Sequence, residues 1–242
     1  MPTQLLCGDC LEMIDTLEDE SVDMVLTDPP YSSGGLFAGD RKARTTSKYC
    51  DTKFLGAARF QEFSGDNMDQ RAFTYFMRMV LSKCRQKAKP ESVCAVFVDW
   101  RNLPAMTDAI QAAGWVYRGI VVWDKGNSRP TPNRFRNDCE YVVWGTNGQR
   151  KAEFKSGVLV LPGCYRVPGV PSKSKQHQTE KPVELLEKLL AICPESGLVL
   201  DPFMGSGSAG VACIKTKRHF IGVELDRGYF ETAQRRIEEA VK

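Results

Sequence analysis

The tetrapeptide Asp28-Pro29-Pro30-Tyr31 has the side chains and the spacing needed to activate an amine. It follows an apolar run, 22–27, which predicts a buried strand that the two prolines must end. Proline holds the residue before it in extended backbone, so the Asp28 carboxylate and the Pro29 carbonyl can face one way as paired acceptors. Such a pair can orient the lone pair of an exocyclic base amine, and the Tyr31 ring gives the base a face to stack on. The alternative is a strand that simply ends in a Pro-Pro turn.

A second segment, 201–208, has the pattern of a loop that binds a nucleotide cofactor. A predicted strand precedes it and an apolar helix follows it, and the next strand ends in Glu224, an acid placed to accept hydrogen bonds from ribose hydroxyls. The Asp201 carboxylate suits a cation such as an α-ammonium group better than a phosphate. A glycine turn without a ligand is the alternative. The predicted cofactor residues of this region are Asp201, Pro202, Phe203, Gly205, Ser206, Gly207, Ser208 and Glu224.

Together, the two segments resemble those of the S-adenosylmethionine-dependent DNA amino-methyltransferases, which methylate adenine at N6 or cytosine at N4. The cofactor loop follows the catalytic motif, so the order resembles the family's β group, a circular permutation of the usual arrangement. The resemblance implies that Asp28-Pro29-Pro30-Tyr31 is catalytic, that Asp28 also borders the cofactor, and that S-adenosylmethionine is the methyl donor. Residues 133–140 resemble the family's penultimate strand motif.

Two further motifs extend the resemblance around the cofactor. Gly8-Asp9-Cys10-Leu11 resembles the segment whose acid contacts the cofactor adenine, although Asp9 also suits a helix cap. His177-Gln178-Thr179-Glu180-Lys181-Pro182 resembles the H-x-T-x-K-P element that closes over the methionine end of the cofactor. The helix amino end at Pro182, with Lys181, would suit the cofactor carboxylate. The resemblance therefore adds to the predicted cofactor residues Asp9, Cys10, His177, Thr179 and Lys181.

The acidic D-P-P-Y form of the motif resembles the N6-adenine enzymes, whereas N4-cytosine enzymes more often carry serine first. We therefore expect an enzyme that flips one adenine out of double-stranded DNA and methylates N6, because N6 is engaged in pairing inside the duplex. Cytosine N4 is an alternative, as is an RNA or protein-amide substrate, or a catalytically idle DNA-binding protein on the same fold. The target sequence and any partner restriction nuclease cannot be read from the chain.

The periodicity predicts a doubly wound α/β fold. Strands are expected near 4–7, 22–27, 93–98, 116–123, 139–145, 198–201 and 219–224, and helices near 10–18, 71–87, 103–113, 182–193, 207–216 and 227–241. Alternation of the two predicts a mostly parallel, seven-stranded, Rossmann-like sheet. With 242 residues, of which 42% are hydrophobic, residues 1–242 fit a single methyltransferase catalytic domain. The stretches 32–70 and 146–181 lack periodicity and are predicted to be loop insertions for DNA recognition or a lid.

The charge is unevenly distributed along the chain. The net charge is only +3, but residues 125–182 carry eleven basic and four acidic side chains, an excess of seven. Such an excess suits a surface that faces phosphates, although a solvated charged face is the alternative. The predicted DNA-binding residues are Arg134, Arg136, Lys173 and Lys175.

The cysteines and the absence of long apolar runs bear on location. Nine cysteines, with no apparent signal peptide, predict a reduced, cytoplasmic protein, and no run is long enough to predict a membrane span. Cys7-x-x-Cys10 lacks the second pair of a zinc site, so no metal is expected. Homodimer formation is left open.

Overall fold

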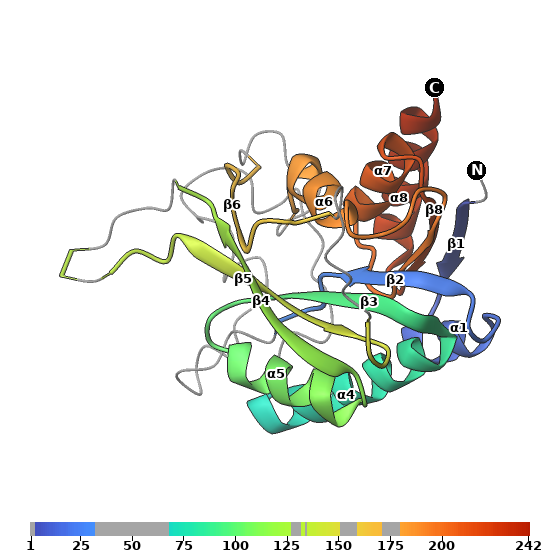
Figure 1. The fold of residues 1–242 in the computed structure, drawn as a ribbon. Helices are drawn as coiled ribbons and strands as arrows, with labels where there is room; N and C mark the ends of the chain where they lie inside the picture. Colours follow the sequence, from blue (N-terminus) through green and yellow to red (C-terminus); the bar gives the residue numbers. More distant parts are fainter. Residues whose placement is uncertain (1–2, 32–67, 127–131, 134, 151–158, 171–179) are drawn as a thin grey trace.

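The computed structural model describes residues 3–31, 68–126, 132–133, 135–150, 159–170 and 180–242. Within these residues eight strands form one sheet (Figure 1). The strands are β1 (Thr3–Cys7), β2 (Val22–Thr27), β3 (Ala88–Val98), β4 (Val116–Asp124), β5 (Cys139–Thr146), β6 (Cys164–Arg166), β7 (Leu198–Asp201) and β8 (His219–Glu224). Their order across the sheet is β1-β8-β7-β2-β3-β5-β4-β6. The first five run parallel, β5 is antiparallel to both β3 and β4, and β6 is parallel to β4.

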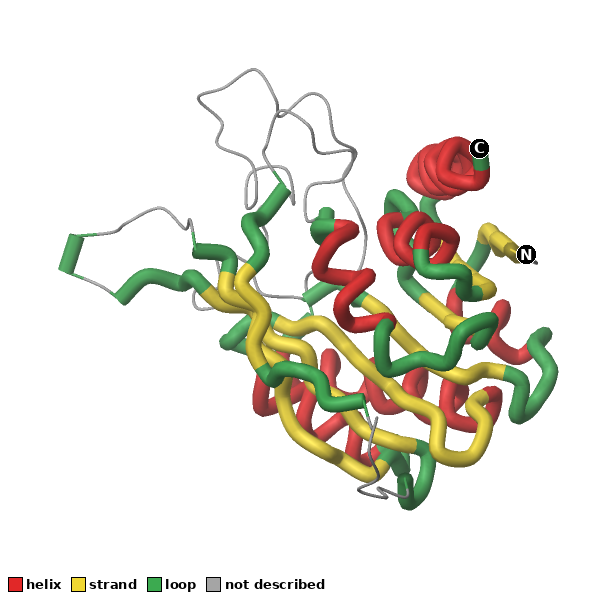
Figure 2. The backbone as a smooth tube through the Cα atoms, turned by 45° about the horizontal axis from the view of Figure 1, so that its top comes forward, coloured by secondary structure: helices red, strands yellow, loops and turns green. Residues whose placement is uncertain are grey.

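Helices cover both faces of the sheet, as Figures 1 and 2 show. One layer contains α1 (Cys10–Asp15), α4 (Gln70–Lys87) and α5 (Leu103–Ala112), and the other contains α6 (Val183–Leu190), α7 (Ser208–Lys215) and α8 (Arg227–Val241). Aspartates at the starts of three helices accept hydrogen bonds from their first-turn amides: Asp9 for α1, Asp69 for α4 and Asp226 for α8. These caps satisfy N–H groups that have no partner within the helix, so the sequence fixes where each helix begins.

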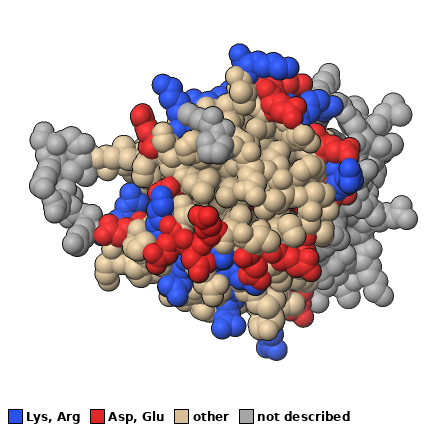
Figure 3. Space-filling model, turned by 90° about the vertical axis from the view of Figure 1, so that its right-hand side faces the viewer, with Lys and Arg blue, Asp and Glu red and all other residues tan. Residues whose placement is uncertain are grey.

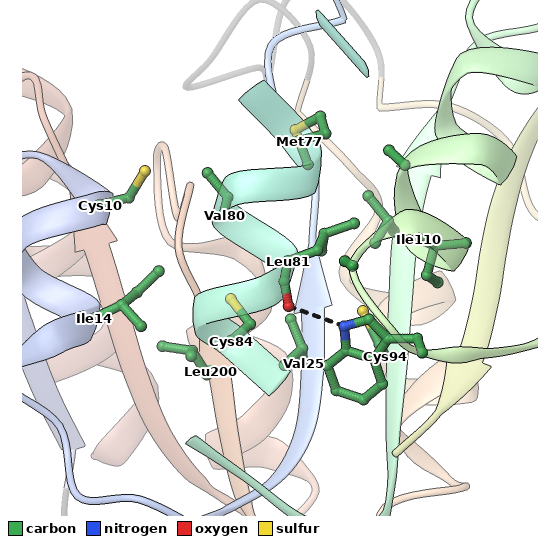
Figure 4. Close-up of a cluster of buried hydrophobic side chains, with 14 of the residues drawn as sticks. Cys10, Ile14, Val25, Met77, Val80, Leu81, Cys84, Cys94, Ile110 and Leu200 are labelled. Carbon is green, nitrogen blue, oxygen red and sulfur yellow. Dashed lines mark hydrogen bonds between the residues drawn. The ribbon is translucent and has the colours of Figure 1, made fainter. Parts of the chain in front are cut away.

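The core on the first face forms around α4 (Figure 4). Met77, Val80, Leu81 and Cys84 recur at helical spacing and are fully buried against the sheet, between α1 and α5. Burial of each such aliphatic side chain contributes about 1.5–3 kcal/mol. The indole Nε1 of Trp115, just before β4, donates to the Leu81 carbonyl at 2.9 Å. This bond ties the helix to the strand without leaving a buried polar group unpaired.

The core on the second face forms under α6, α7 and α8. The buried leucines of α6, Leu185, Leu186, Leu189 and Leu190, follow the 3,4 spacing of an amphipathic helix. They belong to the same cluster as Phe220 of β8, which is fully buried. Because both faces of the central strands are covered, their sequences read as continuous apolar runs rather than alternating ones.

The expected doubly wound, mostly parallel sheet is confirmed, with eight strands in place of seven. The additional strand, β6, lies in the predicted insertion 146–181 and has only three residues, too few to produce a periodic signal. β3 begins at Ala88 rather than near 93, because Lys89-Pro90-Glu91 interrupts its apolar pattern, and its register with β2 shifts there. Most of the predicted insertion 32–70, and parts of 146–181, lie outside the described residues.

Parallel pairing gathers acidic residues at one edge of the sheet. Strands β8 and β7 end at Glu224 and Asp201, and strands β1, β2 and β3 are followed within two residues by Asp9, Asp28 and Asp99. Since β1, β8, β7, β2 and β3 are neighbours in that order and run the same way, these acids form a row along their carboxyl ends. The carboxyl edge is where open α/β sheets bind ligands.

The close approach of α7 to α8 requires Gly210. A Cβ atom there would lie 2.9 Å from Cγ1 of Ile237 and 2.9 Å from Cε1 of Phe220, both in the core. We expect Gly210→Ala to lower the free energy of unfolding by about 1–3 kcal/mol through overpacking, despite alanine's better helix propensity. Urea denaturation measures this change. Gly163→Ala is the control, because nothing lies within 4 Å of a Cβ there; equal effects of the two substitutions would contradict the packing argument.

Candidate active site

A cavity of about 480 Å³ opens at the carboxyl edge of the sheet. It brings together motifs from opposite ends of the chain. The predicted residues that line it are Asp9, Cys10, Asp28, Pro29, Pro30, Tyr31, Lys181, Asp201, Pro202, Phe203, Gly205, Ser206, Ser208 and Glu224. Gly207 is not in the lining, and His177 and Thr179 lie outside the described residues. The fold thus joins the two predicted halves of the site in one space.

The Asp28 carboxylate is held from two sides. Its Oδ1 accepts a hydrogen bond from the Tyr31 hydroxyl at 2.5 Å, and its Oδ2 lies 2.6 Å from Lys181 Nζ. Desolvation raises the pKa of the Tyr31 hydroxyl well above its ordinary value, so this group stays a donor. The sequence predicted an aromatic face at Tyr31. The structure adds a hydroxyl that orients the carboxylate.

Lys181 is the cation at the centre of this cluster. Its side chain is 5% exposed, and Nζ lies 3.4 Å from Glu140 Oε2 as well as 2.6 Å from Asp28. The same ammonium group lies 5.0 Å from the ring centroid of Tyr31 and 5.2 Å from that of Phe97, distances typical of cation–π contacts. The sequence assigned Lys181 to the cofactor carboxylate, and that role stays a prediction. In the structure Lys181 pairs with the acid of the predicted amine site.

Glu140 at the start of β5 completes the cluster. Its Oε1 accepts from Lys125 Nζ at 3.0 Å, and the Tyr31 hydroxyl lies 3.4 Å from its Oε2. Glu140 is the last residue of the predicted strand motif 133–140, but neither it nor Lys125 was predicted to have a role in the site. Their contact requires β4 and β5 to pair as a hairpin, which the sequence pattern alone did not specify.

The charges in the cluster depend on one another. Desolvation raises the pKa of Asp28, and the positive charge of Lys181 opposes that rise. Desolvation would also raise the pKa of Glu140, but Lys181 and Lys125 together hold it below its ordinary value. Burial alone would lower the pKa of Lys181, and the carboxylates of Asp28 and Glu140 reverse this, so its pKa is raised. Lys181 therefore stays charged and favours the ionised form of Asp28.

The backbone of the tetrapeptide is held by the loop after β3. The side-chain amide of Asn102 donates to the Tyr31 carbonyl. Asn102 is itself positioned by Asp99, whose Oδ1 accepts from the backbone N–H groups of Arg101 and Asn102, both at 3.1 Å. Tyr31 is thus fixed at its carbonyl and at its hydroxyl. Asn102 was not among the predicted site residues.

Asp201 links the cofactor loop to the strand that carries the tetrapeptide. Its Oδ1 accepts from the Thr27 hydroxyl at 2.6 Å and from the backbone N–H of Phe203 at 3.0 Å. Desolvation is the largest influence on this buried carboxyl group and raises its pKa to about 7. Asp201 is therefore poised to gain or lose a proton near neutral pH. A cation in the cavity would favour the charged form.

Glu224 and Asp9 each have a structural role beside the cavity. Glu224 accepts from the backbone N–H of Gly205 at 2.9 Å and from that of Asp226 at 2.8 Å, which holds the glycine loop against the end of β8. Asp9 caps α1 through the Leu11 N–H at 2.8 Å. Gly207 has φ of 81°, a left-handed conformation that favours glycine, and the backbone of Ala233 lies close to it. Its position explains why it shapes the loop without lining the cavity.

A contact missed by sequence reasoning joins three parts of the site. The Arg236 guanidinium on α8 donates to Glu180 Oε1 at 2.5 Å and to both the carbonyl and the hydroxyl of Ser206 at 2.8 Å. It therefore ties the cofactor loop to the motif that carries Lys181. In the sequence Arg236 is one of several charged residues on an amphipathic helix, so no local signal distinguished it.

Of the predicted DNA-binding residues, the structure describes Arg136. Its guanidinium lies 3.0 Å from Asp138 Oδ1 and 3.4 Å from the Gly126 carbonyl. Arg134, Lys173 and Lys175 lie outside the described residues. Figure 3 views the side of the molecule that carries β1 and α8, where basic and acidic side chains are interspersed. That face therefore does not have the single-sign charge of a phosphate-binding surface.

The described residues also bear on metal binding and on membranes. No group of three or more His, Cys, Asp or Glu side chains there could hold a metal ion. Among the same residues, no helix combines the length and the apolar character that crossing a membrane requires.

Comparison with known proteins places this site in a family. The family model for N6/N4 methyltransferases, described as DNA methylase, matches residues 22–235. The type II methyltransferase M2.MboI of Moraxella bovis is 26% identical to this chain over an alignment of 251 positions. The alignment covers 96% of this chain and 86% of that protein.

Two solved structures share the fold. The complex of M1.HpyAVI with S-adenosylmethionine has a TM-score of 0.69 at 23% identity and covers 97% of this chain and 98% of its own. The PvuII DNA methyltransferase, which is cytosine-N4-specific, has a TM-score of 0.72 at 17% identity and covers 98% of this chain and 86% of its own. Since the family model spans most of the sequence, the chain belongs to the N6/N4 DNA methylase family, whose members take their methyl group from S-adenosylmethionine.

Proposed function

We propose that this chain is a site-specific DNA methyltransferase that transfers a methyl group from S-adenosylmethionine to N6 of a flipped-out adenine. One observation carries the proposal. The predicted amine motif at Asp28 and the predicted cofactor loop at Asp201 line one cavity of about 480 Å³, and the hydrogen bond from Thr27 to Asp201 joins their strands. A donor and an acceptor bound in that cavity would be held side by side, which removes most of the entropic barrier to their reaction.

The cofactor side of the cavity has groups of suitable charge. When bound, S-adenosylmethionine supplies a methyl group on a positively charged sulfur. We assign Asp201 to its ammonium group, Glu224 to its ribose and Asp9 to its adenine. Lys181, which the sequence predicted for the cofactor carboxylate, is assigned here mainly to Asp28, with which it pairs at 2.6 Å. The row of acids at the carboxyl edge supports these assignments, because the cofactor carries two positive charges. His177 and Thr179 stay in the proposal on the resemblance alone.

The target side of the cavity suits an exocyclic amine. Asp28 accepts a hydrogen bond from the amine and, as the N–C bond forms and the methyl–sulfur bond breaks, is the nearest base for the proton that nitrogen must lose. The Pro29 carbonyl is the second predicted acceptor. Lys181 supports this role, since it favours the carboxylate over the neutral acid, and the Tyr31 ring is available for stacking. The base must leave the duplex because its amine is engaged in pairing there.

Adenine N6 is preferred because the tetrapeptide begins with an acid. The alternative with a specific observation behind it is cytosine N4, since the PvuII enzyme acts on that atom and shares the fold. Expressing the protein in a host that lacks DNA methylation, and sequencing the modified bases of its genome, decides between them. N6-methyladenine at one short sequence supports the proposal. Detection of N4-methylcytosine would mean that the target base is cytosine and not adenine. An unmodified genome would favour a catalytically idle protein.

The remaining parts of the proposal concern the whole chain. We infer that residues 1–242 act as one catalytic domain, which is supported by the single sheet that both core layers share. Double-stranded DNA is the proposed partner and the cytoplasm the proposed location. The roles of 32–70 and 146–181 in DNA recognition, and a homodimer, stay predictions.

Replacing Asp28 tests the amine site directly. We expect Asp28→Ala to abolish methyl transfer and to leave cofactor affinity within a few-fold, because its carboxylate is assigned mainly to the target amine. A radiolabelled-methyl assay and calorimetry measure the two effects. Circular dichroism is needed as a folding control, because the substitution leaves Lys181 with one fewer partner in a buried cluster. Residual activity combined with lost cofactor affinity would assign Asp28 to the cofactor instead.

Replacing Lys181 tests whether it acts through Asp28. In Lys181→Met the pKa of Asp28 should rise further, because the cation that opposes its desolvation is lost. The acidic limb of the rate–pH profile should then move to higher pH, while cofactor affinity changes little, and Lys181→Arg should restore much of the profile. Lys188→Met is the matched control, since its ion pair with Glu184 lies on the surface. A strong loss of cofactor affinity with an unmoved profile would favour the cofactor carboxylate as the partner.

The pKa of Asp201 predicts that cofactor binding depends on pH. Desolvation raises this pKa to about 7, so below pH 7 the free protein holds mostly the neutral acid, which cannot pair with an ammonium group. Binding must then release a proton, and affinity should fall by up to about tenfold per pH unit below 7. Calorimetry between pH 5.5 and about 8.5 measures this fall. In Asp201→Asn the affinity should be weaker throughout and should lose this component of the pH dependence; an identical slope in both proteins would exclude Asp201 as the titrating group.

A further inference from the structure

The Phe135 side chain is fully exposed to solvent. Among the large hydrophobic side chains of the described residues it is the most exposed, at 100%. An aromatic ring in water forgoes the favourable transfer to an apolar environment, so neither folding nor core packing explains its position. Aromatic side chains on a protein surface can serve as platforms on which nucleic-acid bases stack.

Phe135 lies in the connection between β4 and β5, and the described residues 135–138 lead from it into β5 at the left of Figure 1. The base of this connection is closed by several bonds. The backbone N–H of Lys125 donates to the Asp138 carbonyl at 2.8 Å, and the Arg136 guanidinium reaches both Asp138 Oδ1 at 3.0 Å and the Gly126 carbonyl. Phe135 directly precedes Arg136, whose side chain is held by these bonds, so they also restrict the position of Phe135.

The base of the connection also belongs to the active site. Lys125 and Glu140, one from each side of it, form an ion pair at 3.0 Å, and Glu140 lies 3.4 Å from both the Tyr31 hydroxyl and Lys181 Nζ. The exposed ring is therefore five residues along the chain from a side chain that contacts the catalytic tetrapeptide. The base of this connection therefore lies beside the tetrapeptide at which the target base is proposed to bind.

The charge next to Phe135 fits DNA. Arg136 is 43% exposed beside it. A second exposed aromatic–arginine pair lies on the same carboxyl edge, where Trp100 is 48% exposed and the Arg101 guanidinium is 5.1 Å from its ring centroid. The face in Figure 3, by contrast, mixes both signs of charge. Aromatic rings beside cations suit stacked bases flanked by phosphates.

We propose that Phe135 is inserted into the substrate duplex beside the target nucleotide, where its ring fills the stacking gap that the flipped-out base leaves. Apolar side chains inserted between bases offset part of the unstacking free energy. Arg136 contacts a backbone phosphate and positions the ring. This inference rests on the proposed function, because only an enzyme that extracts a base creates such a gap.

The test compares two duplexes that contain the recognition sequence read from the methylated genome. In one the target base is paired, and in the other it lies opposite an abasic site, which lowers the free energy of extraction. We expect Phe135→Ala to reduce kcat/KM by about tenfold or more on the paired duplex and by less than about threefold on the abasic one. Phe135→Leu, which retains an apolar side chain, should recover most of the loss.

Tyr117→Ala is the matched control, because Tyr117 is an exposed aromatic residue at the opposite end of β4 and should behave as the wild type on both duplexes. Equal losses for Phe135→Ala on the two duplexes, or no loss on either, would overturn the inference and leave the proposed function intact. A selective loss in Trp100→Ala but not in Phe135→Ala would also overturn it and assign the insertion to Trp100. If expression of the wild-type protein leaves the host genome unmethylated, the proposed function falls and the inference with it.

Discussion

Parallel pairing of β2 with β7 is the constraint on which the site depends. Met24 pairs with Val199 and Val25 with Leu200, which sets how far each strand reaches toward the cavity. With this register Thr27 meets Asp201, and the carbonyl and carboxylate groups that follow β2 lie beside the cofactor loop. A slip of one residue would turn every side chain of a strand to the opposite face of the sheet. The two apolar cores oppose that slip, because it would expose their side chains. The packing of the helices therefore fixes the positions of the site residues relative to one another.

The same geometry gathers carboxylates whose charges repel one another and are partly removed from water. Lys181 and Lys125 compensate for this within the target half of the cavity. Buried ion pairs contribute little net stability, because desolvation opposes the Coulomb attraction. We therefore interpret the cluster as a means of favouring the ionised form of Asp28 rather than as a contribution to folding. Desolvation raises the pKa of Asp201 to about 7, because among the described residues the hydrogen bonds to its carboxylate come from neutral donors, the Thr27 hydroxyl and the Phe203 N–H.

The two halves of the site are supported differently. On the cofactor side, Glu224 and Arg236 hold the glycine loop through its backbone, from the end of β8 and from α8. On the target side, the support comes from the loop after β3 and from the β4–β5 hairpin, whose connection carries exposed side chains. The cofactor half therefore rests on largely buried side chains of β8 and α8. The target half lies where the sheet meets solvent, as an enzyme with a polymeric substrate requires.

Much of the local secondary structure could be predicted from the sequence. Helix α8 coincides with its predicted range, 227–241, because its cap, spacing and charge are local properties. The lining residues that follow β1, β2 and β7 were predicted for the same reason, since each group is a short segment at a strand end. Only the tertiary structure decided what those residues contact. Lys181 meets Asp28 across 153 positions and Arg236 meets Glu180 across 56, and such pairs depend on strand order, register and helix packing, which a local pattern does not encode. Long-range backbone pairing also places β5 antiparallel between β3 and β4, which brings Glu140 to Tyr31.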